Sequence, residues 1–256
     1  MPVEIPGPAV AFHAVTKRFD DGPPAVDDVT IDIAGGSFVA LVGTSGSGKS
    51  TLLKMVNRLV VPSSGRVTID GADVAERPPA ELRRGIGYVF QNVGLFPHLT
   101  VAENIAMPLA ITGRPAGHRV GELLDLMELP RELGARMPAA LSGGQRQRVG
   151  VARALAAGPR LMLMDEPFGA LDPVTRDALG AAVHALHARL ALTTIMVTHD
   201  MAEALLLATR VLVMDSGAIV ADETPAALLA GAGGPTAQAL VGVPRAQAER
   251  LGALAR

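Results

Sequence analysis

The sequence has no cysteine among its 256 residues. Disulfide bridges, thiolate metal sites and a cysteine nucleophile are therefore excluded, and a reducing compartment would suit the chain. Aromatic residues are also scarce, because the chain has six Phe, one Tyr and no Trp. So few rings argue against a stacking platform for single-stranded nucleic acid.

An excess of charge is missing as well, since 23 Lys and Arg stand against 25 Asp and Glu and the net charge is −2. Without a basic field to attract phosphate backbones, we expect no nucleic-acid partner. The most apolar stretch, 204–214, is interrupted by Arg210, and no basic segment precedes an apolar one at the start. We therefore expect the chain neither to be secreted nor to span a membrane, so that any membrane role comes through a partner.

Short β-branched runs alternate with helical patterns, which predicts an α/β fold. The first runs are VAFHAVT at 10–16, VTIDI at 29–33 and FVALVG at 38–43. The runs FVALV, LMLM at 161–164 and TIMVT at 194–198 lack alternation of apolar and polar residues. Because such runs are typical of parallel strands covered on both faces, we expect these three side by side in one mostly parallel central sheet.

The region at about 92–150 contains no convincing strand. Its patterns at 101–111, 119–127 and 144–157 have helical spacing. We interpret it as a helical insert in the sheet.

A glycine-rich loop directly follows the strand at 38–43. Its sequence GTSGSGKST fits G-x-x-x-x-G-K-[ST] in the strand, loop and helix context that this motif requires. Glycines let N–H groups curl around a phosphate, and the helix N-terminus favours negative charge. Lys49 can bridge β- and γ-phosphate oxygens, while the Ser50 hydroxyl can reach Mg²⁺. The motif predicts a bound nucleotide, which the family resemblance stated below implies to be ATP, together with Mg²⁺. The expected binding residues are Gly43, Thr44, Ser45, Gly46, Ser47, Gly48, Lys49, Ser50 and Thr51.

Two carboxylates follow the apolar strand at 161–164. Open α/β sheets bind ligands at the carboxyl ends of their strands. Asp165 is placed to hold Mg²⁺ through water, and Glu166 to polarise the water that attacks the γ-phosphate. Taken alone, such a pair is often only a polar strand end, but the glycine-rich loop in the same chain favours the catalytic interpretation.

The residues Leu141-Ser142-Gly143-Gly144-Gln145 form a second preformed anion site, a Ser and Gly-Gly turn that opens a helix. With this motif the sequence resembles the ATP-binding subunits of ABC transporters over nearly its whole length. The resemblance implies a P-loop NTPase core with an N-terminal antiparallel β portion and an inserted α-helical subdomain. It also implies a head-to-tail dimer, in which Ser142, Gly143, Gly144 and Gln145 of one chain close over the nucleotide on the glycine-rich loop of the other.

The resemblance implies roles for four further residues. Gln91, expected to end the strand IGYVFQ at 86–91, matches the glutamine that senses Mg²⁺ and the attacking water. His199 matches the switch histidine that hydrogen-bonds the γ-phosphate. Asp172 matches the D-loop aspartate at the dimer interface. Phe19 stands where the family has an aromatic ring under the adenine, although a core residue at a strand end would also fit.

Two segments resemble those of importers of quaternary-amine osmoprotectants, such as glycine betaine, choline and proline betaine. They are KMVNRL at 54–59, and ELRRGIGYVFQ at 81–91 followed by GLFPHLTVAENI at 94–105; the pieces at 57–59 and 94–105 are the most telling. The implied partners are a second ATPase subunit, membrane permease subunits and, indirectly, a substrate-binding protein. The implied location is peripheral, at the cytoplasmic face of the inner (plasma) membrane. Leu95, Phe96 and Leu99 are expected either to dock the permease or to pack the insert's own core.

The predicted domain organisation is an ATP-binding domain at 1–235, containing the insert at about 92–150, and a short tail at 236–256. The tail is expected to be a loose helix at most, because Gly242 and Pro244 should break any long helix. Many members of the resembled group carry CBS domains after the ATPase, and none is expected here.

Two other functions stay open. The chain could serve an importer of another polar solute, such as an amino acid, or be an ABC ATPase acting on nucleic acid or ribosomes. The acidic charge balance and the single ATPase core disfavour the last of these. His184 and His187, three residues apart, lack a third metal ligand and are expected to be solvent exposed.

Overall fold

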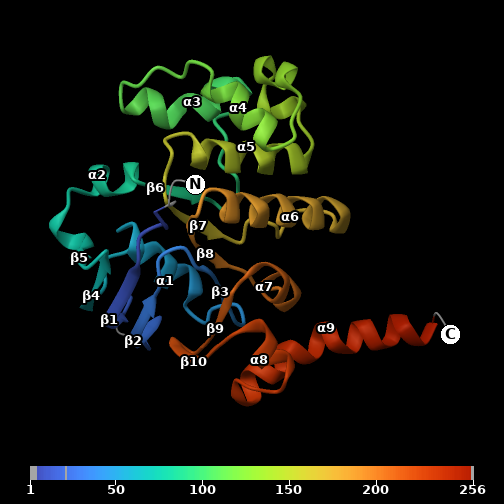
Figure 1. Cartoon of the computed structure of the whole chain (residues 1–256). Coiled ribbons are helices and arrows are strands. Elements are labelled where there is room, and N and C mark those ends of the chain that lie inside the picture. The colour runs from blue at the N-terminus through green and yellow to red at the C-terminus, as the bar shows by residue number, and fades with distance from the viewer. Residues whose placement is uncertain (1–4, 21, 255–256) are drawn as a thin grey trace.

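Two β-sheets lie one against the other and share a buried cluster (Figure 1). The computed structural model describes residues 5–20 and 22–254. The larger sheet has the order β10-β9-β3-β8-β7-β6, in which β10 alone runs antiparallel to its neighbour, and the smaller sheet, β2-β1-β4-β5, is antiparallel. The expected α/β fold class is thereby confirmed. The strands are β1 (Val10–Lys17), β2 (Val26–Ile33), β3 (Phe38–Val42), β4 (Ser64–Ile69), β5 (Ala72–Asp73), β6 (Ile86–Val89), β7 (Leu161–Asp165), β8 (Thr193–Val197), β9 (Arg210–Asp215) and β10 (Ala218–Glu223).

Alternate residues of β3 belong to two different cores. Phe38, Ala40 and Val42 pack in a cluster with residues of α6 (Pro173–Arg189) and α7 (Met201–Leu207). Val39 and Leu41 pack in the other cluster, with α1 (Lys49–Val56) and the smaller sheet. Because both faces are covered, every residue of β3, β7 and β8 is buried. This explains why these strands lack polar alternation.

The insert is helical, as predicted, and lies above the larger sheet in Figure 1. Within the described part of 92–150 the structure assigns helices and turns but no strand. Its apolar residues, among them Val101, Ile105 and Leu123, join the same cluster as one face of β3, so the insert is anchored to the sheet. The remaining helices are α2 (Pro79–Arg84), α3 (Val101–Ile111), α4 (Arg119–Leu126), α5 (Gly143–Leu155) and α8 (Pro225–Leu229), with 3₁₀ helices at Val74–Glu76, Arg131–Ala135 and Pro138–Ala140.

The C-terminal segment differs from expectation. It forms one helix, α9 (Gly234–Leu254), that continues through Gly242 and Pro244 and extends away from the sheets (Figure 1). Ala237 and Val241 are buried and anchor its first half. After Pro244 the helix continues through Ala, Gln, Glu and Arg residues, which favour helix strongly. The prediction that this segment cannot form a long helix was therefore wrong.

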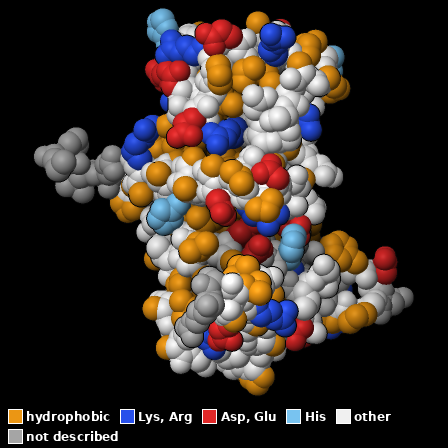
Figure 2. All heavy atoms as spheres, turned by 90° about the vertical axis from the view of Figure 1, so that its right-hand side faces the viewer, with side chains coloured by type: hydrophobic (Ala, Val, Ile, Leu, Met, Phe, Trp, Pro, Cys, Tyr) orange, Lys and Arg blue, Asp and Glu red, His pale blue; other side chains and the backbone are white. Residues whose placement is uncertain are grey.

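Two smaller predictions also need correction. His187 is buried rather than exposed, and its Nδ1 lies 3.0 Å from Thr194 Oγ1. Gln91 does not end a strand, because β6 stops at Val89 and Gln91 lies in the loop that follows. The face drawn in Figure 2 shows acidic and basic side chains interspersed, in keeping with the balanced composition. Among the described residues no helix is both long and apolar enough to cross a membrane.

Candidate functional site

The loop between β3 and α1 is folded tightly against neighbouring strands. Gly43 and Gly48 have φ of +153° and +102°, and a Cβ on them would lie 2.1 Å from the Met214 carbonyl oxygen and 2.0 Å from that of Ala25. Glycine is therefore required at both positions. The loop leads into the N-terminus of α1, where Lys49 is the first helical residue. Backbone N–H groups at such a terminus form a site for phosphate.

Lys49 reaches back over this loop. Its side chain is buried, and Nζ donates to the carbonyl oxygens of Gly43 at 2.9 Å and Thr44 at 2.6 Å, and to Ser47 Oγ at 3.2 Å. Burial lowers the pKa of Lys49, whereas the carboxylates of Glu166 and Asp165 oppose that shift. The ammonium group is thus held inside the loop by oxygen acceptors, the kind of partner that phosphate oxygens also provide.

Ser50 and Asp165 meet at the carboxyl end of β7. The Ser50 hydroxyl donates to Asp165 Oδ1 at 2.6 Å, and Asp165 is 3% exposed. Its other oxygen contacts Lys54 Nζ at 3.0 Å and accepts from the Tyr88 hydroxyl at 3.3 Å. Burial and the neighbouring Asp165 raise the pKa of Tyr88, which stays a neutral donor.

The donor set here fits Mg²⁺. A serine hydroxyl and a carboxylate are hard oxygen ligands, and the Gln91 amide could supply a third. The described residues contain no cluster of three or more His, Cys, Asp or Glu that could hold a metal. A site of this kind suits Mg²⁺, which keeps several waters and is bound through few protein ligands together with phosphate oxygens.

Three predicted catalytic side chains converge next to this site. Gln91 Nε2 donates to Glu166 Oε2 at 3.1 Å, and His199 Nδ1 lies 3.3 Å from the same oxygen. They follow β6, β7 and β8, neighbouring strands whose carboxyl ends share one edge of the sheet. Glu166 has φ of +48°, and its backbone N–H donates to the Val197 carbonyl at 2.9 Å. A carboxylate, an amide and an imidazole are therefore assembled around one point.

The motif at 141–145 forms a well-capped helix start. Gln145 N donates to Ser142 Oγ at 3.2 Å, and Ser142 N donates to Gln145 Oε1 at 2.9 Å, which completes a capping box. A Cβ on Gly144 would lie 2.3 Å from Thr175 Cγ2, so this turn lies closely against α6. The capping box and this close contact together fix the start of α5.

This motif and the glycine-rich loop of the same chain are held by different cores. Helix α1, which carries Lys49, packs in one core, whereas α5, which begins at Gly143 after the Ser142 cap, packs in the other. Asp172 is also separate: it caps α6 by accepting from Thr175 N at 3.0 Å, and this hydrogen bond lowers the pKa of Asp172.

Phe19 is 50% exposed, and Lys17 Nζ lies 5.0 Å from its ring centre. The alternative that Phe19 is a core residue is wrong. Such a half-exposed ring just after β1 could stack on a planar group.

Sequence reasoning overlooked Tyr88 and Lys54 as contacts of Asp165. Lys54 lies four residues after Ser50 on α1, so it shares a helix face with Ser50, and that spacing could have indicated it. Tyr88 pairs with Leu163 across β6 and β7, a register that the sequence does not reveal.

Comparison with known proteins now identifies the family. The family model for the ABC transporter matches residues 26–169. The chain belongs to this family. It is 48% identical over 221 residues to the glycine betaine/carnitine/choline transport ATP-binding protein OpuCA of Bacillus subtilis, a match that covers 85% of this chain and 58% of OpuCA. The chain thus spans less than two thirds of that relative.

One further relative and one solved structure are also similar to this chain. The Fe(3+) ions import ATP-binding protein FbpC of Pseudomonas fluorescens is also 48% identical, over 85% of this chain and 62% of its own length. Among solved structures, the dimeric structure of a post-hydrolysis state of an ATP-binding cassette bound to ADP and Pi has a TM-score of 0.77 and 35% identity. That match covers 84% of this chain and 98% of the other.

Proposed function

We propose that this chain is the ATP-hydrolysing subunit of an importer, with quaternary-amine osmoprotectants as the solute class. The observation that carries the ATPase proposal is the convergence of Gln91, Glu166 and His199 beside Lys49, Ser50 and Asp165. Lys49 would neutralise phosphate charge, and Ser50, Asp165 and Gln91 would hold Mg²⁺, which supplies charge stabilisation on the phosphates when bound.

Within this site we assign Glu166 the role of general base. Its Oε2 already accepts from Gln91 and lies beside His199, so a water near the three groups could lose a proton to the carboxylate. His199 would donate a hydrogen bond to the γ-phosphate, and Gln91 would orient the water. Phe19 would stack on the adenine, while Ser142, Gly143, Gly144 and Gln145, with Asp172, would act on the nucleotide of a second chain.

The test is a comparison of purified wild-type chain with Glu166→Gln. We expect the variant to bind Mg-ATP with unchanged affinity and to hydrolyse it at least about a hundredfold more slowly, because general-base losses are of that size. Hydrolysis is measured as phosphate release and binding by equilibrium titration. Wild-type turnover by the variant would overturn the assignment of Glu166.

The solute class rests on segments 54–59 and 94–105 and on the similarity to OpuCA. Percentage identity does not decide it, since the Fe(3+) ions import ATP-binding protein FbpC is also 48% identical. The experiment that decides the solute class is reconstitution of the chain with its cognate permease in vesicles. ATP-dependent uptake of radiolabelled glycine betaine, and no uptake of amino acids, is the expected result; the reverse would favour the amino-acid alternative.

We further propose that the chain attaches to the cytoplasmic face of the membrane through that permease. A cavity of about 540 Å³ suits the contact, and it lies next to the catalytic site. Gln91 and Asp165 are among its polar lining residues, and Phe96, Met107 and Ile111 are among its apolar ones. Leu95 instead packs against the buried core. Of the residues expected either to dock the permease or to pack the insert, Phe96 thus fits docking and Leu95 fits packing.

A further inference from the structure

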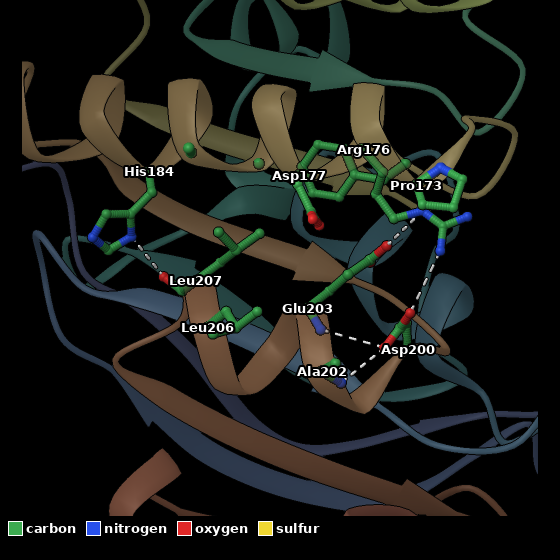
Figure 3. A pocket seen from close by; sticks show the side chains of 12 residues that line it. Pro173, Arg176, Asp177, His184, Asp200, Ala202, Glu203, Leu206 and Leu207 are labelled. Carbon is green, nitrogen blue, oxygen red and sulfur yellow. Dashed lines mark hydrogen bonds and ion pairs between the residues drawn. The ribbon is translucent and has the colours of Figure 1, made fainter. Parts of the chain in front are cut away.

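Helices α6 and α7 enclose a cavity of about 420 Å³ next to the catalytic loops (Figure 3). Helix α6 begins immediately after Asp172, and α7 begins two residues after His199. The side chains of Arg176, Asp200 and Glu203 meet at one end of this cavity. The cavity therefore lies between the two loops that are proposed to act on the nucleotide.

Arg176 contacts both loops at once. Its Nη2 donates to the carbonyl oxygen of Leu171 at 3.0 Å, directly before Asp172. Its Nη1 lies 3.7 Å from Asp200 Oδ2, and its Nε lies 3.7 Å from Glu203 Oε1. One planar guanidinium thus connects the loop before α6, by a hydrogen bond, to the start of α7, by two ion pairs that are too long to be hydrogen bonds.

Glu203 extends this network to Thr198, the residue that precedes His199. Its side chain is 11% exposed, and Oε2 accepts from Thr198 Oγ1 at 2.5 Å. Thr198 is buried, and its Oγ1 in turn accepts from Asp200 N at 3.0 Å. The residues before and after His199 are therefore both tied to Glu203 and Arg176.

His199 itself needs such support. Its side chain is 58% exposed, and its contact with Glu166 spans 3.3 Å. An exposed imidazole has little packing to fix it, so its position depends on the backbone at Thr198 and Asp200. Displacements of about 1 Å at a catalytic group are enough to reduce rates strongly.

We propose that Arg176 is a positioning residue, which holds His199 against Glu166 and fixes the loop at 170–172 relative to it. The proposal rests on the ATPase function proposed above and deepens it. Through this network, a shift of the D-loop residue Leu171 moves the backbone on both sides of His199. A second copy that engaged Asp172 would thereby influence the site within the first chain.

The alternative is a purely structural role, in which Arg176 only stabilises the packing of α6 against α7. The two roles predict different kinetics. A structural role would change stability and the fraction of active protein. A positioning role lowers kcat per nucleotide-binding site while KM for ATP is kept, because no atom of this network lies in the glycine-rich loop.

The experiment uses the full chain with Arg176→Leu and Arg176→Lys. We expect Arg176→Leu to lower kcat about tenfold, with KM within about twofold of wild type. Arg176→Lys can replace part of the contact and should recover part of kcat. Arg189→Leu, at the exposed opposite end of the same helix, is the matched control and should resemble wild type. An unchanged kcat in Arg176→Leu would overturn the proposal. So would a fall in total activity that equals the fall in the fraction of protein able to bind ATP.

A double-mutant cycle tests whether Arg176 acts through Glu203. Glu203→Gln should also lower kcat, and the double variant Arg176→Leu with Glu203→Gln should lose no more than the larger single loss. Multiplying losses would show independent action and overturn the network. If Arg176→Leu fails to fold, Arg176→Lys takes its place in the cycle with the same criterion.

A spectroscopic measurement separates this proposal from the ATPase function. The histidine Cε1–H signal of His199, assigned by its loss in His199→Asn, is followed by NMR without nucleotide. In Arg176→Leu it should shift or broaden, while the signal of His13, on β1 of the smaller sheet, stays in place. If the wild-type chain had no ATPase activity but Arg176→Leu still showed this shift, the network would stand and the proposed function would be refuted. An unmoved His199 signal would refute the network.

Discussion

At the scale of single residues, His187 links burial to pH dependence. It lies in the core beside Phe38, with ring centres 5.1 Å apart, and burial lowers its pKa, assisted by the neighbouring His184. In the unfolded chain a histidine has a pKa of about 6.5. Below that pH the unfolded chain binds a proton that folded His187 resists, so stability falls as the pH decreases.

We therefore expect the unfolding midpoint of the wild type to fall more between about pH 7.5 and 5.5 than that of His187→Asn. Asparagine can keep a hydrogen bond to Thr194, although the variant loses the ring contact and is less stable at the higher pH. Urea titrations at both pH values measure the difference. Equal declines in the two proteins would show that His187 does not contribute.

At the scale of elements, the insert is expected to transmit the nucleotide state through the segment after Gln91. Arg153 on α5 donates to the carbonyl oxygens of Val93 and Gly94 at 2.5 and 2.7 Å. A Cβ on Gly150 would lie 2.7 Å from Val93 Cγ1, so this segment lies close against α5. Residues 93–94 are thus held in place by α5. Movement at Gln91 would therefore turn the segment about these residues and shift the lining of the cavity that is proposed to contact the permease.

Phe96→Asp tests the docking role of this cavity. Phe96 is 41% exposed, so a charged residue can be accommodated in the free chain but would be desolvated under a permease. We expect recovery of the chain with permease-containing membranes to fall at least about tenfold, with ATP hydrolysis by the free chain kept.

Val220→Asp on β10, where Val220 is 44% exposed and outside the cavity, is the control and should still be recovered with the membranes. Loss of folding in Phe96→Asp, seen as a collapsed unfolding transition, would instead support the alternative that this side chain packs the insert.

Elements differ in how far the sequence could predict them. The residues of α3 followed directly from helical spacing, which is a local signal, and the structure adds a capping box at Thr100 that stabilises the same helix start. The course of α9 did not, because burial of Ala237 and Val241 against other elements outweighs the local cost of Pro244. In the same way, Ser50 and Asp165 could be found from motifs, whereas the Arg176 contacts depend on how α6 and α7 pack.

At the scale of the whole molecule, each chain carries both halves of a nucleotide site but presents them from different cores. Lys49 begins α1 and Ser142 caps α5, and these helices pack in separate clusters. The similar cassette with ADP and Pi was solved as a dimer. A head-to-tail dimer would let the two halves meet across the interface, so we expect hydrolysis to need two chains.

Mixing two inactive variants tests this arrangement. In a mixed dimer of Lys49→Ala and Ser142→Arg, one site combines both defects, and the other combines the intact Lys49 with the intact Ser142. Random pairing in equal amounts makes half of the dimers mixed, so activity should recover to about one quarter of wild type per chain. Phosphate release from the mixture, compared with each variant alone, measures the recovery.

The control replaces the Ser142→Arg chain with one that carries both substitutions. Every dimer in that mixture lacks an intact composite site, because no chain has Lys49, and its activity should stay at the background of the single variants. If each chain instead hydrolysed ATP with its own Lys49 and Ser142, mixing would restore nothing in either experiment. Recovery in the first mixture and none in the second therefore requires that the Ser142 turn of one chain completes the site on the glycine-rich loop of another.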